Sequence, residues 1–108
     1  MKLKDRVAIV TGGGKGIGEE ICLGLAKEGA KIVIAEIDIA HSENAKKKIL
    51  DAGSEAIIVK TDVSKKDSIN EMVDKAIQTF GKIDILINNA GIRPVSYTHL
   101  TLPTSIQV

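Results

Sequence analysis

A glycine-rich segment near the N-terminus, Thr11-Gly12-Gly13-Gly14-Lys15-Gly16-Ile17-Gly18, has residue types and spacing suited to binding a phosphate group. Glycines remove the side chains that would keep a ligand away from the backbone, and the free amides at a helix N-terminus attract anions. The spacing Gly-x-x-x-Gly-x-Gly matches neither the Gly-x-Gly-x-x-Gly fingerprint nor the Gly-Lys-Ser/Thr ending of a nucleoside-triphosphate loop. Because a predicted strand precedes this turn and a predicted helix follows it, we expect the turn to bind the pyrophosphate of a dinucleotide. A tight turn without a ligand is the alternative.

Glu36 is the acidic residue best placed to bind the sugar of such a dinucleotide, because it lies 20 residues beyond Gly16 and follows an apolar run. Its carboxylate would accept hydrogen bonds from both ribose hydroxyls. A 2′-phosphate in the same place would bring like charges to about 4 Å, which costs on the order of 1–4 kcal/mol. The expected cofactor is therefore NAD rather than NADP. The alternatives are Asp38 as the rival acid, Lys15 as a phosphate partner, and a merely solvated charge at Glu36.

The alternation of apolar runs and helical periods predicts the elements that hold these residues. The predicted strands are residues 7–10, 31–35, 56–59 and 83–87, and the predicted helices are residues 17–28, a polar segment ending near 51, and residues 64–80. This β-α-β-α-β-α-β order predicts an α/β protein with a doubly wound parallel sheet, helices on both faces and strand order 3-2-1-4. Ser64 with Asp67 is the capping signal expected to begin the third helix, and Gly81 is expected to end it.

Composition limits the class of protein. The chain has 108 residues, of which 44% are hydrophobic and 27% charged, so it fits one globular unit and not a disordered chain or a two-domain enzyme. The net charge of +1 predicts no nucleic-acid or anionic-membrane partner. The single cysteine, Cys22, cannot form an internal disulfide and is expected in the core, while His41 is expected to be solvated. No apolar run approaches the roughly 18 residues of a membrane span and no signal peptide is expected, so the predicted location is cytoplasmic.

Three motifs in this order resemble the short-chain dehydrogenase/reductase family over residues 3 to about 92. They are Thr11-Gly12 with Gly16-Ile17-Gly18, then Asp62-Val63, then Asn88-Asn89-Ala90-Gly91. The resemblance implies the N-terminal part of a Rossmann fold, truncated here, in which Asp62 and Val63 contact adenine. It also implies that Asn89, Ala90 and Gly91 line the cofactor and steady the sheet. The complete set of expected cofactor-binding residues is Thr11, Gly12, Gly14, Lys15, Gly16, Ile17, Gly18, Glu36, Asp62, Val63, Asn89, Ala90 and Gly91.

The family resemblance also implies a reaction, hydride transfer between a nicotinamide and a small alcohol or carbonyl compound such as a 3-oxoacyl group, a sugar or a polyol. In the family a Tyr-x-x-x-Lys pair and a preceding serine handle the proton. Tyr97 has Thr101 where the lysine belongs and Ser96 directly beside it, so no catalytic residue is predicted in this chain. No metal site is expected, and the intact parent is expected to be a homo-oligomer.

Two alternatives to an active oxidoreductase remain. One is a catalytically inactive fragment that binds a dinucleotide. The other is a chain that does not fold stably, because the apolar edge of its fourth strand, residues 85–87, is left open to other chains.

The composition changes abruptly after Arg93, since residues 94–108 contain no Asp, Glu, Lys or Arg. One possible set of codons for residues 95–104 is GTC TCT TAT ACA CAT CTG ACG CTG CCG ACG, which resembles the transposon end and adapter used in fragment-library sequencing. We therefore expect a partial NAD(P)-binding Rossmann domain in residues 1–93 and a non-native tail in residues 94–108. A natural, divergent loop is the alternative.

Overall fold

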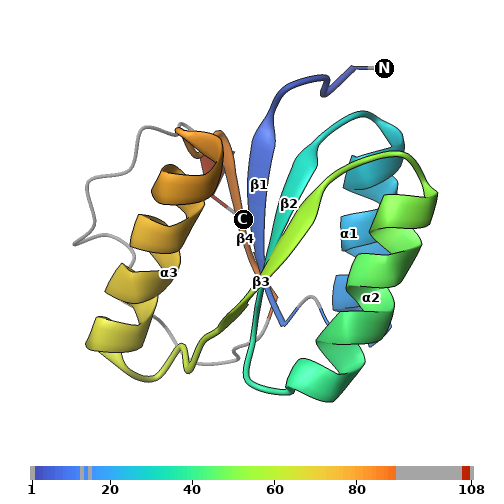
Figure 1. The fold of residues 1–108 in the computed structure, drawn as a ribbon. Coiled ribbons are helices and arrows are strands. Elements are labelled where there is room, and N and C mark those ends of the chain that lie inside the picture. The colour runs from blue at the N-terminus through green and yellow to red at the C-terminus, as the bar shows by residue number, and fades with distance from the viewer. Residues whose placement is uncertain (1, 13, 15, 90–105, 108) are drawn as a thin grey trace.

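The computed structural model describes residues 2–12, 14, 16–89 and 106–107 of the chain. Strands and helices alternate along it, as the sequence predicts (Figure 1). The strands are β1 (Val7–Thr11), β2 (Lys31–Glu36), β3 (Ala56–Lys60), β4 (Ile85–Asn88) and β5 (Ile106–Gln107), and the helices are α1 (Gly16–Lys27), α2 (Ile39–Asp51) and α3 (Lys66–Phe80).

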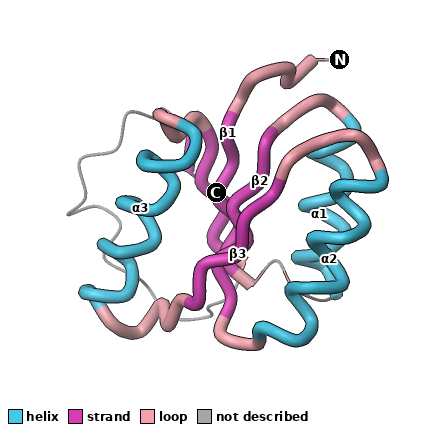
Figure 2. The backbone as a smooth tube through the Cα atoms, viewed as in Figure 1, coloured by secondary structure: helices cyan, strands magenta, loops and turns pink. Residues whose placement is uncertain are grey.

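The strands form one parallel sheet in the order β3-β2-β1-β4-β5, so the predicted order 3-2-1-4 is confirmed. Helices α1 and α2 cover one face of this sheet and α3 covers the other (Figure 1). Because the strands run in the same direction, the loops that follow β1, β2 and β3 gather at one end of the sheet (Figure 2). Ligands of doubly wound sheets bind at this carboxyl edge.

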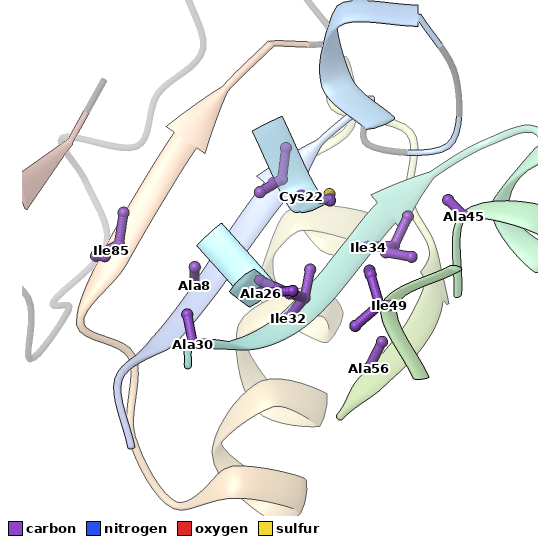
Figure 3. Packing of buried hydrophobic residues seen from close by; sticks show 11 residues of the cluster. Ala8, Cys22, Ala26, Ala30, Ile32, Ile34, Ala45, Ile49, Ala56 and Ile85 are labelled. Atoms are coloured by element: carbon purple, nitrogen blue, oxygen red, sulfur yellow. The ribbon is translucent and has the colours of Figure 1, made fainter. Parts of the chain in front are cut away.

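Successive residues of β1 pack on opposite faces, as the period of a strand requires. Val7 and Ile9 belong to the core beneath α3, whereas Ala8 and Val10 belong to the core beneath α1 and α2. Figure 3 shows the second of these cores, in which Cys22 of α1 is buried as predicted. All five residues of β1 are buried, which is why this strand reads as an uninterrupted apolar run followed by threonine.

Opposite the carboxyl edge, Asp84 ties the start of β1 to the start of β4. Its Oδ2 accepts a hydrogen bond from the Val7 amide at 2.9 Å and lies 3.2 Å from the Lys82 ammonium, while Oδ1 lies 3.4 Å from the Arg6 guanidinium. Burial alone would raise the pKa of Asp84, but the Val7 amide, Lys82 and Arg6 together hold that pKa below its ordinary value. The charged Asp84 carboxylate therefore links two strands that are far apart in sequence.

The predicted start of α3 is wrong. The helix begins at Lys66, its N-cap is Lys65, and that residue makes no side-chain capping hydrogen bond. Ser64 instead turns back and bonds to Asp62. The predicted end is confirmed, because Gly81 follows the last helical residue and its amide donates to the Ile77 carbonyl at 2.8 Å.

The edge of β4 is not fully open, contrary to the expectation of an unpaired fourth strand. β5 pairs with it in parallel over two residues, with Ile106 opposite Ile85 and Gln107 opposite Leu86. The expected boundary near Arg93 and the tail residues 94–105 and 108 lie outside the described residues. In the part of the chain that the structure describes, no helix has the length and apolar character to span a lipid bilayer.

Candidate functional site

A cavity of about 330 Å³ lies at the carboxyl edge of the sheet, where β1 to β4 end. This volume is in the range of small-molecule sites. The residues that line it are Gly12, Glu36, Ile37, Thr61, Asp62, Val63 and Asn89. Five of the seven are residues that the sequence predicts to bind a cofactor.

The glycine turn after β1 forms one side of this site through close backbone packing. Gly12 has a φ of 67°, in the left-handed region, and its amide donates to the Ala35 carbonyl of β2 at 2.7 Å. A Cβ added to Gly18 would stand 2.0 Å from the Gly12 carbonyl oxygen and 2.7 Å from the Asn89 side-chain nitrogen. Only a glycine at position 18 therefore lets α1 begin this close to the end of β1.

The rest of the turn includes a second tight contact and an exposed apolar side chain. A Cβ added to Gly14 would lie 2.7 Å from the Ser42 hydroxyl and 3.1 Å from Cγ of Glu36, so this glycine packs against α2 and the end of β2. Gly16 is the first residue of α1, and the side chain of Ile17 beside it is 70% exposed. Lys15 lies outside the described residues.

Thr11 and Asn89 join the ends of β1 and β4. The Asn89 amide donates to the Thr11 hydroxyl oxygen at 2.9 Å, and the Asn89 side-chain amide donates to the Gly12 carbonyl at 3.3 Å. The Thr11 hydroxyl, which is fully buried, reaches the Ile87 carbonyl at 3.3 Å and the Asn88 side-chain oxygen at 3.2 Å. These bonds hold the glycine turn at a fixed distance from the end of β4. Ala90 and Gly91 lie outside the described residues.

Of the two candidate ribose acids, Glu36 lines the cavity and Asp38 caps a helix. Glu36 ends β2 with only 8% of its surface exposed, and its carbonyl accepts a hydrogen bond from the Thr61 amide at 3.0 Å. Asp38 is the N-cap of α2, where its carboxylate accepts from the His41 amide at 3.2 Å and lies 2.6 Å from the His41 ring nitrogen. The His41 side chain is exposed, as predicted, and its ring contacts the Asp38 carboxylate.

Asp62 forms the part of the cavity at the end of β3. Its Oδ1 accepts two hydrogen bonds from Ser64, at 2.6 Å from the hydroxyl and 3.0 Å from the amide. These bonds from Ser64, with a smaller contribution from the charge of Lys65, hold the pKa of Asp62 below its ordinary value. Asp62 is therefore an ionised, acceptor-only group at neutral pH.

Two lining residues, Ile37 and Thr61, are absent from the predicted site. Each stands next to a predicted residue at the end of a strand, and that adjacency is the signal that would have found them. Ser96 and Tyr97 lie outside the described residues. Among residues 2–12, 14 and 16–89, no group of three or more His, Cys, Asp and Glu side chains is arranged to hold a metal ion.

Comparisons with known proteins identify the family of this chain. The family described as short chain dehydrogenase matches residues 6–107. The chain belongs to the short-chain dehydrogenase family. The resemblance inferred from the three motifs is thereby confirmed, and the family is one of NAD(P)-binding oxidoreductases.

Individual members of the short-chain dehydrogenase family match most of this chain. A CLA biosynthesis dehydrogenase/reductase of Lactiplantibacillus plantarum is 43% identical over 89 residues, covering 82% of this chain and 31% of its own length. The 3beta-hydroxysteroid dehydrogenase 2 of Eggerthella lenta is 39% identical over 90 residues, covering 83% of this chain and 35% of its own. The chain thus spans about a third of the length of these curated relatives.

Solved structures of short-chain dehydrogenases show the same fold. An NAD+-bound xylitol dehydrogenase superposes with a TM-score of 0.82 at 36% identity, over 84% of this chain and 35% of the other. A metagenomic short-chain oxidoreductase in complex with NADP superposes with a TM-score of 0.81 at 34% identity, over 85% of this chain and 42% of the other. Both forms of the cofactor therefore occur among similar structures.

Proposed function

We propose that this chain holds the adenosine diphosphate half of NAD in an oxidoreductase that interconverts a small alcohol and a carbonyl compound. The observation that carries the proposal is the cavity at the carboxyl edge of the sheet, with Glu36, Asp62 and Asn89 around one opening. When bound, the nicotinamide cofactor supplies or accepts the hydride. The residues of this chain bind and orient the cofactor.

The site fits an unphosphorylated dinucleotide. No atom of the described residues lies within 4 Å of an ideal Cβ on Gly16, so the space beside the first residue of α1 is open to a pyrophosphate, and the partial positive charge of a helix N-terminus favours such an anion. Glu36 is nearly buried beside this turn, so its carboxylate would accept hydrogen bonds from the ribose hydroxyls in a site that screens charge poorly. A 2′-phosphate would meet that carboxylate at close range, which is why we prefer NAD to NADP.

The proton chemistry of the reaction is assigned to no residue of this chain. The single tyrosine, Tyr97, lacks a lysine four positions later. The chain by itself is therefore proposed to bind the dinucleotide and to show no hydride transfer with NADH and a panel of small aldehydes, ketones and 3-oxoacyl thioesters. Oxidation of NADH by the 108-residue chain, followed at 340 nm, would contradict this part of the proposal.

Isothermal titration calorimetry with NAD and NADP tests the cofactor preference. The wild-type chain should bind NAD more tightly, and Glu36→Gln should reduce the ratio of the NADP to the NAD dissociation constant by about tenfold or more, because it removes the like-charge repulsion. Glu71→Gln, at an exposed position of α3, is the matched control and should leave the ratio unchanged. Equal ratios for the wild type and Glu36→Gln would refute the role of Glu36, and no heat with either nucleotide would refute the proposed function.

A further inference from the structure

Lys60, the last residue of β3, lies directly beside Glu36, the last residue of β2. The two residues are paired in the register of the parallel sheet, and the amide of the next residue, Thr61, donates a hydrogen bond to the Glu36 carbonyl at 3.0 Å. Neighbouring strands lie about 5 Å apart, so the two backbones are held at that separation. Because β3 is the outermost strand on its side of the sheet, Lys60 stands at the corner of the carboxyl edge.

The side chains of Glu36 and Lys60 leave the sheet on the same face. Ile34 and Ile58, two residues earlier in each strand, pack in the core beneath α1 and α2. Successive side chains of a strand alternate between faces, so Glu36 and Lys60 also point to the side of α1 and α2. The glycine turn reaches the same place, since an ideal Cβ on Gly14 would lie 3.1 Å from Cγ of Glu36. Glu36 therefore stands between the turn that follows β1 and Lys60 of β3.

Lys60 has a mobile positive charge at this corner, whereas Glu36 is nearly buried. The Lys60 residue is exposed, and among residues 2–12, 14 and 16–89 no ion pair or side-chain hydrogen bond involves its ammonium. A lysine ammonium is a compact charge on a flexible four-carbon stem, so it can move toward an anion that binds beside the end of β2. Glu36 is proposed to hold the ribose hydroxyls, and a phosphate on that ribose would therefore come within reach of Lys60.

The charges of Glu36 and Lys60 have opposite effects on such a phosphate. A phosphate monoester carries close to two negative charges at pH 7. At equal distance and equal screening, its attraction to one ammonium is as large as its repulsion from one carboxylate. Lys60 can therefore offset much of the penalty that Glu36 imposes on a 2′-phosphate.

We propose that Lys60 is a specificity-determining residue whose ammonium binds the 2′-phosphate of NADP, so that the site accepts NADP as a weaker second cofactor although Glu36 disfavours it. This inference rests on the proposed function, since it requires the ribose of the cofactor at Glu36. It assigns a ligand contact to a residue outside both the predicted site and the cavity wall. With NAD, which has a hydroxyl in place of the phosphate, the ammonium stays in water.

The experiment measures the ratio of the NADP to the NAD dissociation constant by calorimetry for the 108-residue chain and its variants. Lys60→Gln removes the charge, Lys60→Glu reverses it and Lys60→Arg keeps it. Lys75→Gln is the matched control, because it removes the same charge from an exposed position of α3, on the other face of the sheet (Figure 1). Lys60→Gln is also combined with Glu36→Gln, and circular dichroism melts establish that each variant is folded.

Lys60→Gln should raise the ratio by about threefold to tenfold, through weaker binding of NADP and not of NAD. Lys60→Glu should raise the ratio further, whereas Lys60→Arg and Lys75→Gln should keep the wild-type value. A direct contact with the phosphate does not depend on the charge of Glu36, so Lys60→Gln should raise the ratio by a similar factor when Glu36 is already glutamine.

Three results would overturn the inference and leave the proposed function intact. The first is an unchanged ratio in Lys60→Gln, including equal weakening of both dinucleotides, as a merely structural role requires. The second is the loss of the effect in the Glu36→Gln background, which would mean that Lys60 only screens Glu36. The third is a wild-type chain that binds NAD and gives no heat with NADP. Absence of binding to either dinucleotide would refute the proposed function itself.

Discussion

The carbonyl oxygen of Gly12 occupies the space in which a side chain on Gly18 would begin, since an ideal Cβ there would be 2.0 Å away. The end of β1 and the first turn of α1 are therefore in backbone contact. Gly24, in the same helix, has no atom within 4 Å of its own ideal Cβ position. One helix thus contains a glycine that the fold requires and a glycine that it does not.

Gly18→Ala should destabilise the chain by about 1–3 kcal/mol, because the methyl group must push the Gly12 carbonyl and the Asn89 side chain apart. The affinity for NAD should fall at least about tenfold with it. Gly24→Ala should instead stabilise by about 0.5–1 kcal/mol, since alanine has the better helix propensity. Urea denaturation of the two variants provides the comparison, and equal effects at both positions would contradict the packing argument.

Thr11→Val should cost about 1–3 kcal/mol although the side chains have the same shape, because the Asn89 amide would lose its acceptor at the end of β4. Thr11→Ser keeps the hydroxyl and removes only a buried methyl group, at a cost of about 1 kcal/mol. The free energies of unfolding of both variants can be read from chemical denaturation. A valine variant as stable as the serine variant would mean that the hydroxyl does not join the strands.

The stability of the chain should fall in acid partly because of Asp84. Its pKa is lower in the folded state than in the unfolded chain, so its contribution is complete above about pH 5. That contribution is lost as the pH falls through the ordinary aspartate value of about 3.9 and then through the lower folded-state pKa. Asp84→Asn should be less stable at pH 7 and show a shallower decline between pH 5 and pH 3.

The matched control for Asp84→Asn is Asp51→Asn, at the exposed last residue of α2. It should keep the wild-type dependence of the melting temperature on pH. If the stability of Asp84→Asn fell as steeply between pH 5 and pH 3 as that of the wild type, the contacts of Asp84 between β1 and β4 would contribute nothing measurable to stability.

Cys22 should react with thiol reagents only when the chain unfolds. Burial, with a smaller contribution from Glu19, raises the pKa of the Cys22 thiol to about 12, so it stays protonated at pH 8. Labelling by a disulfide reagent at that pH should be on the order of a thousandfold slower in buffer than in concentrated urea. The sequence has one cysteine, so the absorbance change reports this site alone. Rapid labelling under native conditions would show that the α1 side of the core is open.

The sheet and its strand order could be predicted because each central strand is buried on both faces and therefore reads as a short apolar run. Val7–Thr11 and Lys31–Glu36 are such runs, and the glycine turn and Glu36 follow them directly. In a parallel sheet, residues that end neighbouring strands come together at one edge, so much of the cavity wall could also be predicted.

What could not be predicted depends on which of several possible partners a residue contacts. The spacing of Ser64 and Asp67 suits a helix cap, but the carboxylate of Asp62 lies within reach of the Ser64 hydroxyl and captures it. The bond from the Val7 amide to Asp84 spans 77 positions, and nothing in the local sequence marks it. The pairing of β5 with β4 is likewise a tertiary contact.

The most deeply buried strand, β1, ends directly in the turn proposed to hold the cofactor, and it has β2 on one side and β4 on the other. Separating β1 from its neighbours would expose both cores at once, so the free-energy cost of opening this strand should approach that of global unfolding. We therefore expect the amide protons of β1 to exchange among the slowest of the described residues. A dinucleotide bound at the turn would stabilise the native state, because a ligand that binds only that state adds RT ln(1 + [L]/Kd) to the free energy of unfolding.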